Sequence, residues 1–150
     1  MSAPLPPTDS FRMPLRVRYE ETDAAGVVYY ANYLTWFEVA RIELLRELGV
    51  PITEVERRGV ALPVVEAGCR YLKPAHVDDL LELRLWLRPP RRASFAFDYQ
   101  VWRTEELLAE GHTVHTTVER ATLKPVRMPE WFAELLAGVA HTAMTAGTRR

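Results

Sequence analysis

A single carboxylate, Asp23, lies in a short loop just before the longest helical pattern of the chain. The residues that follow it are small, and Gly26 allows the backbone to approach a ligand closely. The first amides of a helix have no intrahelical acceptor, so the start of the helix is electropositive. This helix end can stabilise the carboxylate, or it can bind a ligand oxyanion while Asp23 acts beside it.

Three tyrosines within five residues, Tyr29, Tyr30 and Tyr33, follow this loop. Their rings give an apolar lining that still forms hydrogen bonds, which is more typical of a binding pocket than of a plain turn. A simpler interpretation stays open, in which Asp23 is a turn or capping residue and each tyrosine packs in the core.

A local basic cluster consists of Arg88, Arg91 and Arg92, which surround two consecutive prolines. Guanidinium groups on such a stiff loop are suited to binding phosphate oxygens, and Ser94 adds a hydroxyl donor. The alternative is a solvated hairpin loop.

Two histidines on one predicted strand, His112 and His115, are three residues apart, so their side chains point to opposite faces. They are therefore poorly placed to chelate one metal ion together. The only cysteine, Cys69, cannot form an internal disulfide or a cysteine-based metal cage. We expect no metal site.

One long helix is predicted over residues 31–48, which lack Gly and Pro and precede the stop signal of Gly49 and Pro51. Glu38 and Arg41 are spaced to form an ion pair on its surface. The apolar stripe expected to face the core consists of Leu34, Phe37, Ile42, Leu44, Leu45 and Leu48.

After this helix the hydrophobic period changes from 3.6 to 2. Alternation over residues 81–88 and 94–101 predicts two strands with one buried face each. Further strands are predicted over 15–19, 64–72 and 107–122, with a loop over 20–30, a hairpin turn at Glu105-Glu106 and a short helix over 129–137.

These elements predict an α+β fold in which an antiparallel sheet of about five strands curves around one long helix. The outer face, which carries Trp86 and Trp102, looks too apolar for a monomer and predicts a homo-oligomer. The proline-rich residues 1–14 predict a loose arm and residues 138–150 a frayed tail. One domain with an ordered core of about 14–137 remains.

The composition of the 150 residues, 48% hydrophobic and 26% charged, is that of a folded globular domain. Nineteen Lys and Arg against twenty Asp and Glu provide no global field for nucleic acid or an anionic membrane. We expect no membrane insertion, because no apolar run is long enough for a spanning helix. The N-terminal residues lack a signal-peptide pattern, so we expect a cytoplasmic protein.

The residues from Tyr19 to Arg41, which read YEETDAAGVVYYANYLTWFEVAR, closely resemble the signature of hot-dog-fold acyl-CoA thioesterases. The resemblance is to the 4-hydroxybenzoyl-CoA thioesterase-like family, and especially to its Tol–Pal-associated branch. Segments 62–75 and 108–115 resemble strands of that branch, and the similarity covers residues 15–132. Many relatives in the branch have histidine where this chain has Tyr30.

The resemblance implies a sheet wrapped around the long helix, with active sites at a dimer interface. It also implies that Asp23 is the catalytic carboxylate and that the N–H of Tyr30 binds the thioester oxygen. Predicted substrate contacts are Gly26, Val28, Tyr29, Asn32, Tyr33, Arg91, Arg92 and Ser94.

We therefore expect an acyl-CoA thioesterase that forms a dimer or tetramer and uses no cofactor beyond the CoA of its substrate. Asp23 acts either as general base or as nucleophile, and the sequence leaves both open. Two alternatives also stay open, a hot-dog dehydratase or hydratase acting on thioesters, and a non-catalytic acyl-CoA-binding protein.

Overall fold

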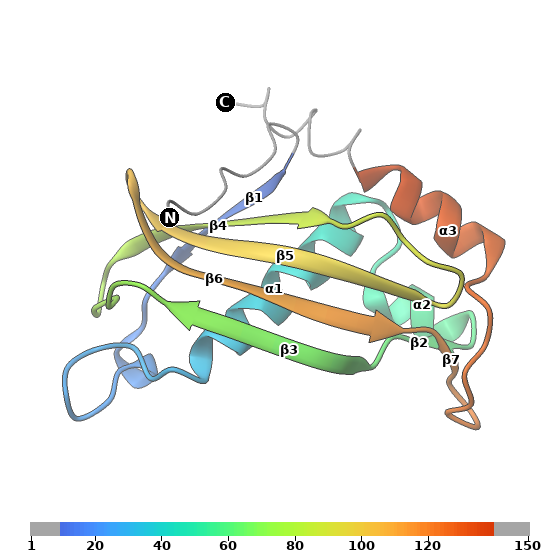
Figure 1. Ribbon diagram of the computed structural model, residues 1–150, viewed down its shortest axis with the longest axis horizontal. Helices are drawn as coiled ribbons and strands as arrows, with labels where there is room; N and C mark the ends of the chain where they lie inside the picture. The colour runs from blue at the N-terminus through green and yellow to red at the C-terminus, as the bar shows by residue number, and fades with distance from the viewer. Residues whose placement is uncertain (1–9, 140–150) are drawn as a thin grey trace.

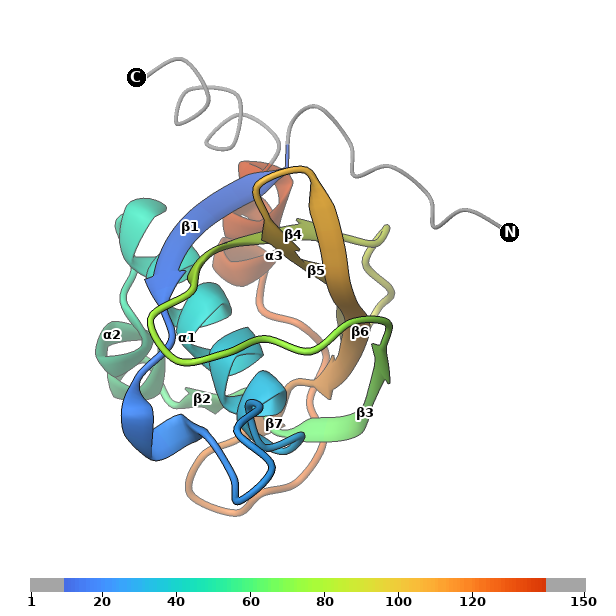
Figure 2. The same cartoon turned by 90° about the vertical axis from the view of Figure 1, so that its left-hand side faces the viewer.

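The structure, a computed structural model, describes residues 10–139 and is built on one antiparallel sheet with strand order β1-β4-β5-β6-β3. The sheet wraps around one long helix, α1 (Asn32–Glu47) (Figures 1 and 2). This is the predicted α+β architecture. The strands of the sheet are β1 (Phe11–Arg16), β3 (Val64–Tyr71), β4 (Leu80–Leu87), β5 (Ser94–Arg103) and β6 (Glu106–Thr116).

The other elements are short. Two short strands, β2 (Val60–Ala61) and β7 (Val118–Glu119), pair with each other. The remaining elements are the 3-10 turn η1 (Tyr19–Glu21) and the helices α2 (Ile52–Arg57) and α3 (Glu130–Ala137). The predicted short final helix is confirmed as α3, with Pro129 at its N-cap, whereas α2 was not predicted.

Helix α1 packs its buried face directly on the concave side of the sheet. The ring of Phe37 stacks on Tyr99 at a centroid distance of 4.3 Å. Gly111 of β6 makes this approach possible, since a Cβ there would lie 2.5 Å from Phe37 Cε2. The helix and the sheet therefore share one core.

The predicted helix is confirmed, and Phe37, Leu44 and Leu45 of the predicted stripe are buried, but the buried face differs from the prediction at other positions. Leu34 is 40% exposed, whereas Tyr33, Trp36 and Ala40 are buried. The prediction weighted leucine too heavily over the large aromatic side chains, which bury more surface when they face the core.

The first strand begins earlier than predicted. Residues 11–14 belong to β1 and are not part of a loose arm, and the chain has already left the strand at Val17. Pro14 is tolerated because β1 is an edge strand that pairs with β4 alone. The rest of the predicted arm, residues 1–9, and residues 140–150 of the predicted tail lie outside the described part of the chain.

The convex face of the sheet is more polar than predicted. Trp102 is half-buried beneath the guanidinium of Arg84, 4.7 Å from the ring centroid, and its indole N–H donates to Gln100. Arg84 also pairs with Glu82 at 2.6 Å. Trp102 is therefore not part of a bare apolar surface.

Strand β3 is the second edge strand of the sheet, opposite β1. It pairs with β6 on one side, and no other strand within residues 10–139 covers its second side. Val64 and Val65 at its start and Tyr71 and Leu72 at its end are all exposed. Within the same residues, no helix is long and apolar enough to cross a bilayer.

Candidate active site

The loop that carries Asp23 is closed by its own backbone. Thr22 and Val28 form an isolated antiparallel bridge, and the Asp23 amide donates to the Val27 carbonyl at 2.8 Å. Gly26 has a φ of 82°, a conformation that favours glycine, and its amide donates to the Asp23 carbonyl at 3.0 Å. The position of Asp23 is thus set by a tight turn.

The two carboxylate oxygens of Asp23 have different surroundings. Oδ1 accepts a hydrogen bond from the Ala25 amide at 2.8 Å, which makes Asp23 a turn-forming residue. Oδ2 accepts no hydrogen bond from the residues that the structure describes, and the side chain is exposed. One oxygen therefore holds the loop while the other is free to accept a proton or attack a carbonyl carbon.

The backbone leading into α1 presents an unpaired donor, as predicted for the start of a helix. The amide N–H of Tyr30 donates to no acceptor within residues 10–139, and Ala31, the N-cap, has no side-chain cap. The Tyr30 carbonyl, in contrast, accepts a hydrogen bond from the Tyr71 hydroxyl at 2.8 Å. The peptide chain at Tyr30 is held in place with its N–H available.

Four tyrosines gather around this donor: Tyr29 and Tyr30 before α1, Tyr33 in its first turn, and Tyr71 in β3. The rings of Tyr29 and Tyr30 lie 4.6 Å apart, and Tyr71 meets Tyr33 edge-on at 5.1 Å. Partial desolvation of its hydroxyl raises the pKa of Tyr71 to about 12, and burial raises the pKa of Tyr33. These hydroxyls therefore stay protonated at neutral pH. Sequence reasoning missed Tyr71, which is separated from Tyr30 by 41 residues.

The predicted substrate contacts near Asp23 fall into two groups. Tyr29 and Gly26 are exposed beside the loop, as a binding role requires. Val28 and Tyr33 are buried in the core, and the side-chain amide of Asn32 donates to the Glu21 carbonyl at 2.8 Å. The second group supports the loop from behind.

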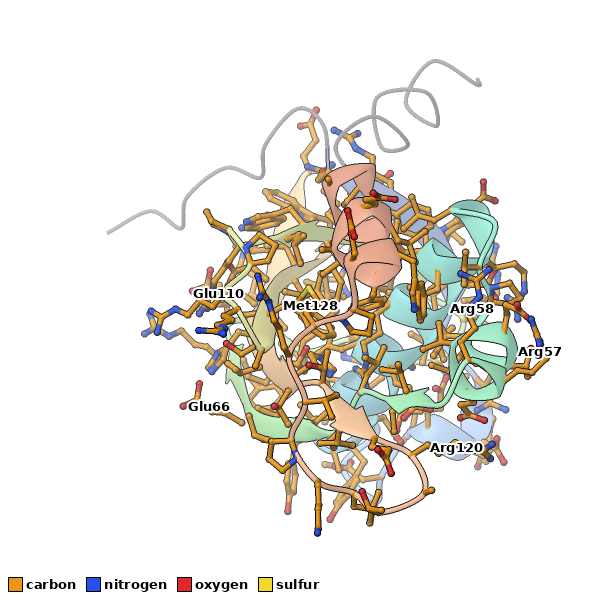
Figure 3. The ribbon with its side chains drawn as sticks, turned by 90° about the vertical axis from the view of Figure 1, so that its right-hand side faces the viewer. Arg57, Arg58, Glu66, Glu110, Arg120 and Met128 are labelled. Atoms are coloured by element: carbon orange, nitrogen blue, oxygen red, sulfur yellow. The ribbon has the colours of Figure 1, made fainter. Side chains whose placement is uncertain are left out.

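The basic cluster is present and is larger than predicted. Arg91 and Arg92 line a hollow of about 1120 Å³ with Arg127, which sequence reasoning missed. The Met128 amide donates to the Arg92 carbonyl at 3.0 Å and so joins the β4–β5 connection to the segment entering α3. Figure 3 views this end of the molecule and shows Met128 on that segment.

Two of the predicted phosphate contacts, Arg88 and Ser94, are not among the residues that line this hollow. Arg88 is engaged by Asp98 in two hydrogen bonds of 2.9 and 2.8 Å, so it is not a free guanidinium. Ser94 begins β5, is half-buried, and accepts the Arg91 amide with its carbonyl at 2.9 Å.

The loop before α1, which carries Asp23, and the β4–β5 connection, which carries the arginines, lie at opposite ends of the sheet (Figure 1). Tyr71, at the end of β3, contacts the helix start, whereas Val64, at its beginning, pairs with His115 close to the first residues of β5. The eight residues of β3 span roughly 25 Å. The fold of one chain therefore does not bring the two predicted parts of the site together.

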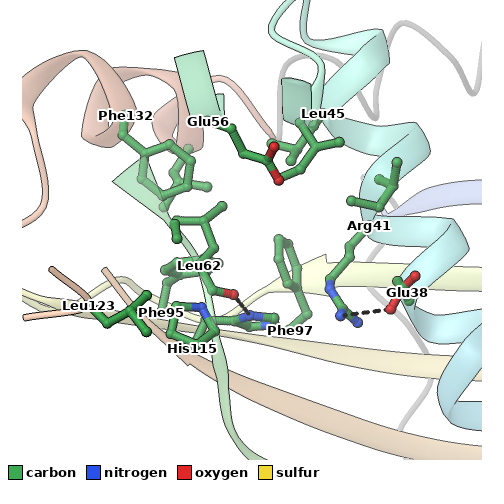
Figure 4. Close-up of a pocket in the computed structure, with 15 residues that line it drawn as sticks. Glu38, Arg41, Leu45, Glu56, Leu62, Phe95, Phe97, His115, Leu123 and Phe132 are labelled. Atoms are coloured by element: carbon green, nitrogen blue, oxygen red, sulfur yellow. Dashed lines mark hydrogen bonds and ion pairs between the residues drawn. The ribbon is translucent and has the colours of Figure 1, made fainter. Parts of the chain in front are cut away.

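An apolar cavity of about 580 Å³ lies at the arginine end, between α1, α2, α3 and the sheet (Figure 4). His115 forms part of its wall, stacked on Phe95 at 4.9 Å and hydrogen bonded to Thr113 and to the Leu62 carbonyl. Burial lowers the pKa of His115 to about 4, so the imidazole is neutral there at neutral pH. The apolar part of the lining consists of Ile42, Leu45, Ile52, Ala61, Leu62, Pro63, Phe95, Phe97, Leu123, Phe132 and Leu136.

Charged groups of α1 and α2 also line this cavity. Glu56 lines it, and the predicted pair of Glu38 and Arg41 is confirmed at 4.0 Å. Two carboxylates and one guanidinium around an apolar space favour an uncharged apolar ligand group over an anionic one.

Comparisons with known proteins agree with one another. The model of the thioesterase-like superfamily matches residues 17–136. The chain is 36% identical over 124 residues to the acyl-CoA thioester hydrolase YbgC of Escherichia coli O6:H1, covering 82% of this chain and 92% of that protein. It is 35% identical over 123 residues to the acyl-CoA thioesterase YbgC of Haemophilus influenzae, covering 81% and 90%. A crystal structure of a hypothetical protein from Aquifex aeolicus superposes with a TM-score of 0.81 and 36% identity, covering 84% of this chain and 98% of that one.

Proposed function

The chain belongs to the thioesterase-like superfamily and is an acyl-CoA thioester hydrolase with a hot-dog fold, and we propose that Asp23 and the Tyr30 amide carry its reaction. The observation that supports this most directly is the free Oδ2 of Asp23 on a closed loop that leads into an unpaired helix amide. An acid beside a preorganised donor is the minimal equipment for hydrolysing an activated ester.

A thioester needs little more, because its leaving group is stable as an anion. A thiol has a pKa of about 8.5, so the thiolate departs without a general acid. In the proposed step, Asp23 takes a proton from water while the water oxygen bonds to the carbonyl carbon. The Tyr30 N–H stabilises the oxyanion, the carbon–sulfur bond then breaks, and the proton passes from Asp23 to the thiolate. Only water and the chain's own groups take part, so we propose that no cofactor is needed.

The nucleophilic route differs in one covalent bond. There the Asp23 carboxylate attacks the carbonyl and expels the thiolate, and water then opens the resulting mixed anhydride. Hydrolysis in ¹⁸O-water detects one form of the nucleophilic route, because label enters the Asp23 carboxylate when water opens the anhydride at the aspartyl carbon, whereas opening at the acyl carbon leaves Asp23 unlabelled as the general-base route does. We propose the general-base route and expect no label in Asp23.

We infer that two chains in a homodimer complete the site. The same pair of chains would be present whether the protein is a dimer or a tetramer. The support is the uncovered edge of β3, with exposed valines at one end and Tyr71 at the other. Antiparallel pairing of two such edges about a two-fold axis brings the arginine end of one chain to the Asp23 end of its partner. The distance between Asp23 and the arginines within one chain is then no obstacle.

This assembly assigns a role to both features at the arginine end. Arg91, Arg92 and Arg127 bind the phosphates of CoA, for which a guanidinium cluster is suited. The neighbouring cavity receives the acyl group, which we propose to be apolar and uncharged.

A complementation experiment tests the shared site. Asp23→Asn and the triple variant Arg91→Ala, Arg92→Ala, Arg127→Ala are each prepared alone and then mixed as unfolded chains before refolding. If Asp23 and the arginines of one site come from different chains, a mixed dimer regains one intact site, and activity measured at acyl-CoA concentrations well below the KM of the triple variant rises above that of either parent. No recovery after mixing contradicts the shared site.

The activity itself is tested with a panel of acyl-CoA esters and a reagent for free thiols. We expect release of CoA thiol. Binding of acyl-CoA without thiol release favours the non-catalytic alternative, and addition of water to an enoyl-CoA favours the hydratase.

We propose two finer assignments. We place the chain in the Tol–Pal-associated branch, on the strength of the signature from Tyr19 to Arg41. We also propose that it acts in the cytoplasm, which is consistent with its lone cysteine, the free thiol of Cys69.

A further inference from the structure

Glu21, two residues before Asp23, is a buried carboxylate that the proposed reaction does not use. It is 6% exposed, in contrast to Glu20, which is exposed and pairs with Arg18 at 2.5 Å. A buried carboxylate is costly unless donors satisfy it, so its partners indicate what it does.

The Glu21 side chain joins the loop to the helix. Oε2 accepts the indole N–H of Trp36 at 2.6 Å, one turn inside α1, and Oε1 accepts the Arg18 amide at 2.8 Å. The indole is itself 1% exposed, so this bond lies in the core and holds its geometry.

The Glu21 backbone makes a second connection to the same helix end. Its carbonyl accepts the Tyr29 amide at 2.9 Å and the Asn32 side-chain amide at 2.8 Å. One residue therefore links the base of the Asp23 loop to three places around the first turn of α1, where the Tyr30 donor lies.

We propose that Glu21 is a positioning residue that sets the Asp23 carboxylate against the Tyr30 amide, an inference that rests on the proposed function. Hydrolysis needs water, the carbonyl carbon and the oxyanion donor in one geometry. A misplacement of about 1 Å can lower a rate on the order of 100-fold. Glutamine cannot replace this carboxylate, because its NH₂ group would face one of the two N–H donors.

Two variants test the proposal by different routes. Trp36→Phe removes the indole donor while keeping an aromatic ring, and Glu21→Gln removes the charge and one acceptor. We expect each to lower kcat by roughly 10- to 100-fold and to change KM by less than about threefold. The double variant should lose little more than the worse single one, because both break one connection. Trp36→Phe carries the test if Glu21→Gln does not fold.

Two controls separate positioning from loss of stability. Glu20→Gln changes the exposed neighbouring acid, and Val55→Ala weakens the core at α2, away from the loop. Both should keep kcat within about twofold at a temperature where they are folded. The proposal is overturned if folded Trp36→Phe keeps kcat within about twofold while Asp23→Asn loses activity. If Asp23→Asn remains active, the proposed function fails instead.

Discussion

The hydroxyl of Tyr71 donates to the carbonyl of Tyr30 at 2.8 Å and so ties the last residue of β3 to the start of α1. The carbonyl belongs to the peptide that follows the unpaired Tyr30 N–H. The edge strand β3 therefore also holds the proposed oxyanion donor in place, which couples the proposed dimer edge to the proposed chemistry.

Removing that hydroxyl should weaken catalysis without unfolding the protein. We expect Tyr71→Phe to lower kcat several-fold and stability by about 1 kcal/mol, the usual net contribution of one hydrogen bond. Steady-state kinetics and urea denaturation measure the two effects. Tyr19→Phe, at an exposed tyrosine, is the matched control. Unchanged kcat in Tyr71→Phe would show that the Tyr30 donor is held by other contacts.

Loss of the Asp23 charge should abolish most of the activity. We expect Asp23→Asn to lower hydrolysis at least ~100-fold, the usual contribution of a general base. The fold should survive, because the asparagine oxygen can still accept the Ala25 amide. Glu105→Gln, at the exposed β5–β6 turn, should remain fully active. A folded Asp23→Asn enzyme with near-normal turnover contradicts the assignment.

The arginine cluster should matter for CoA esters and not for truncated ones. Replacing Arg91, Arg92 and Arg127 with Ala should raise KM for acyl-CoA by roughly 10-fold or more, since charge-assisted bonds to phosphate are lost. Pantetheine esters lack the nucleotide, so their KM should not change. Arg57→Ala removes a guanidinium engaged by Glu54 and serves as control. An equal rise for both ester types would exclude phosphate binding.

Filling the apolar cavity should change acyl selectivity. Ile42 is half-buried in its wall, so Ile42→Trp should lower kcat/KM for bulky acyl-CoA esters by roughly 10-fold or more, whereas acetyl-CoA should be little affected. Val77→Trp, at an exposed residue outside the lining, should leave both unchanged. If Ile42→Trp lowers kcat/KM equally for bulky acyl-CoA esters and for acetyl-CoA, the acyl group does not bind in this cavity.

Burial of His115 should make the fold sensitive to acid. Its pKa is lowered to about 4 in the folded chain, from about 6.5 in the unfolded chain. Between pH 6.5 and pH 4, His115 is therefore protonated in the unfolded chain and neutral in the folded chain. The free energy of unfolding should therefore fall by about 2 kcal/mol through this group between pH 7 and pH 5. In His115→Gln the free energy of unfolding should fall less between pH 7 and pH 5, because this contribution is absent. In His76→Gln, at an exposed histidine, it should fall as much as in the unchanged protein. Urea denaturation at both pH values measures the difference.

Local pattern was enough to predict the helix, most of the strands and the loop that presents Asp23. These features are visible in the sequence because they depend on residues that are close along the chain. They are the stop signal of the helix, the alternation of apolar and polar residues in the strands, and the small residues of the turn after Asp23. The same reasoning placed the first strand too late, because pairing of β1 with β4 overrides the local signal of Pro14.

The contacts that complete the candidate site were decided by the tertiary structure alone. Glu20 and Glu21 are identical side by side in the sequence, and only the turn of η1 directs Glu21 inward to Trp36. Tyr71 and Arg127 come to their places from distant segments through strand pairing and packing. Side chains that meet across long sequence separations leave no periodic signal, because their spacing is set by the sheet and not by the chain.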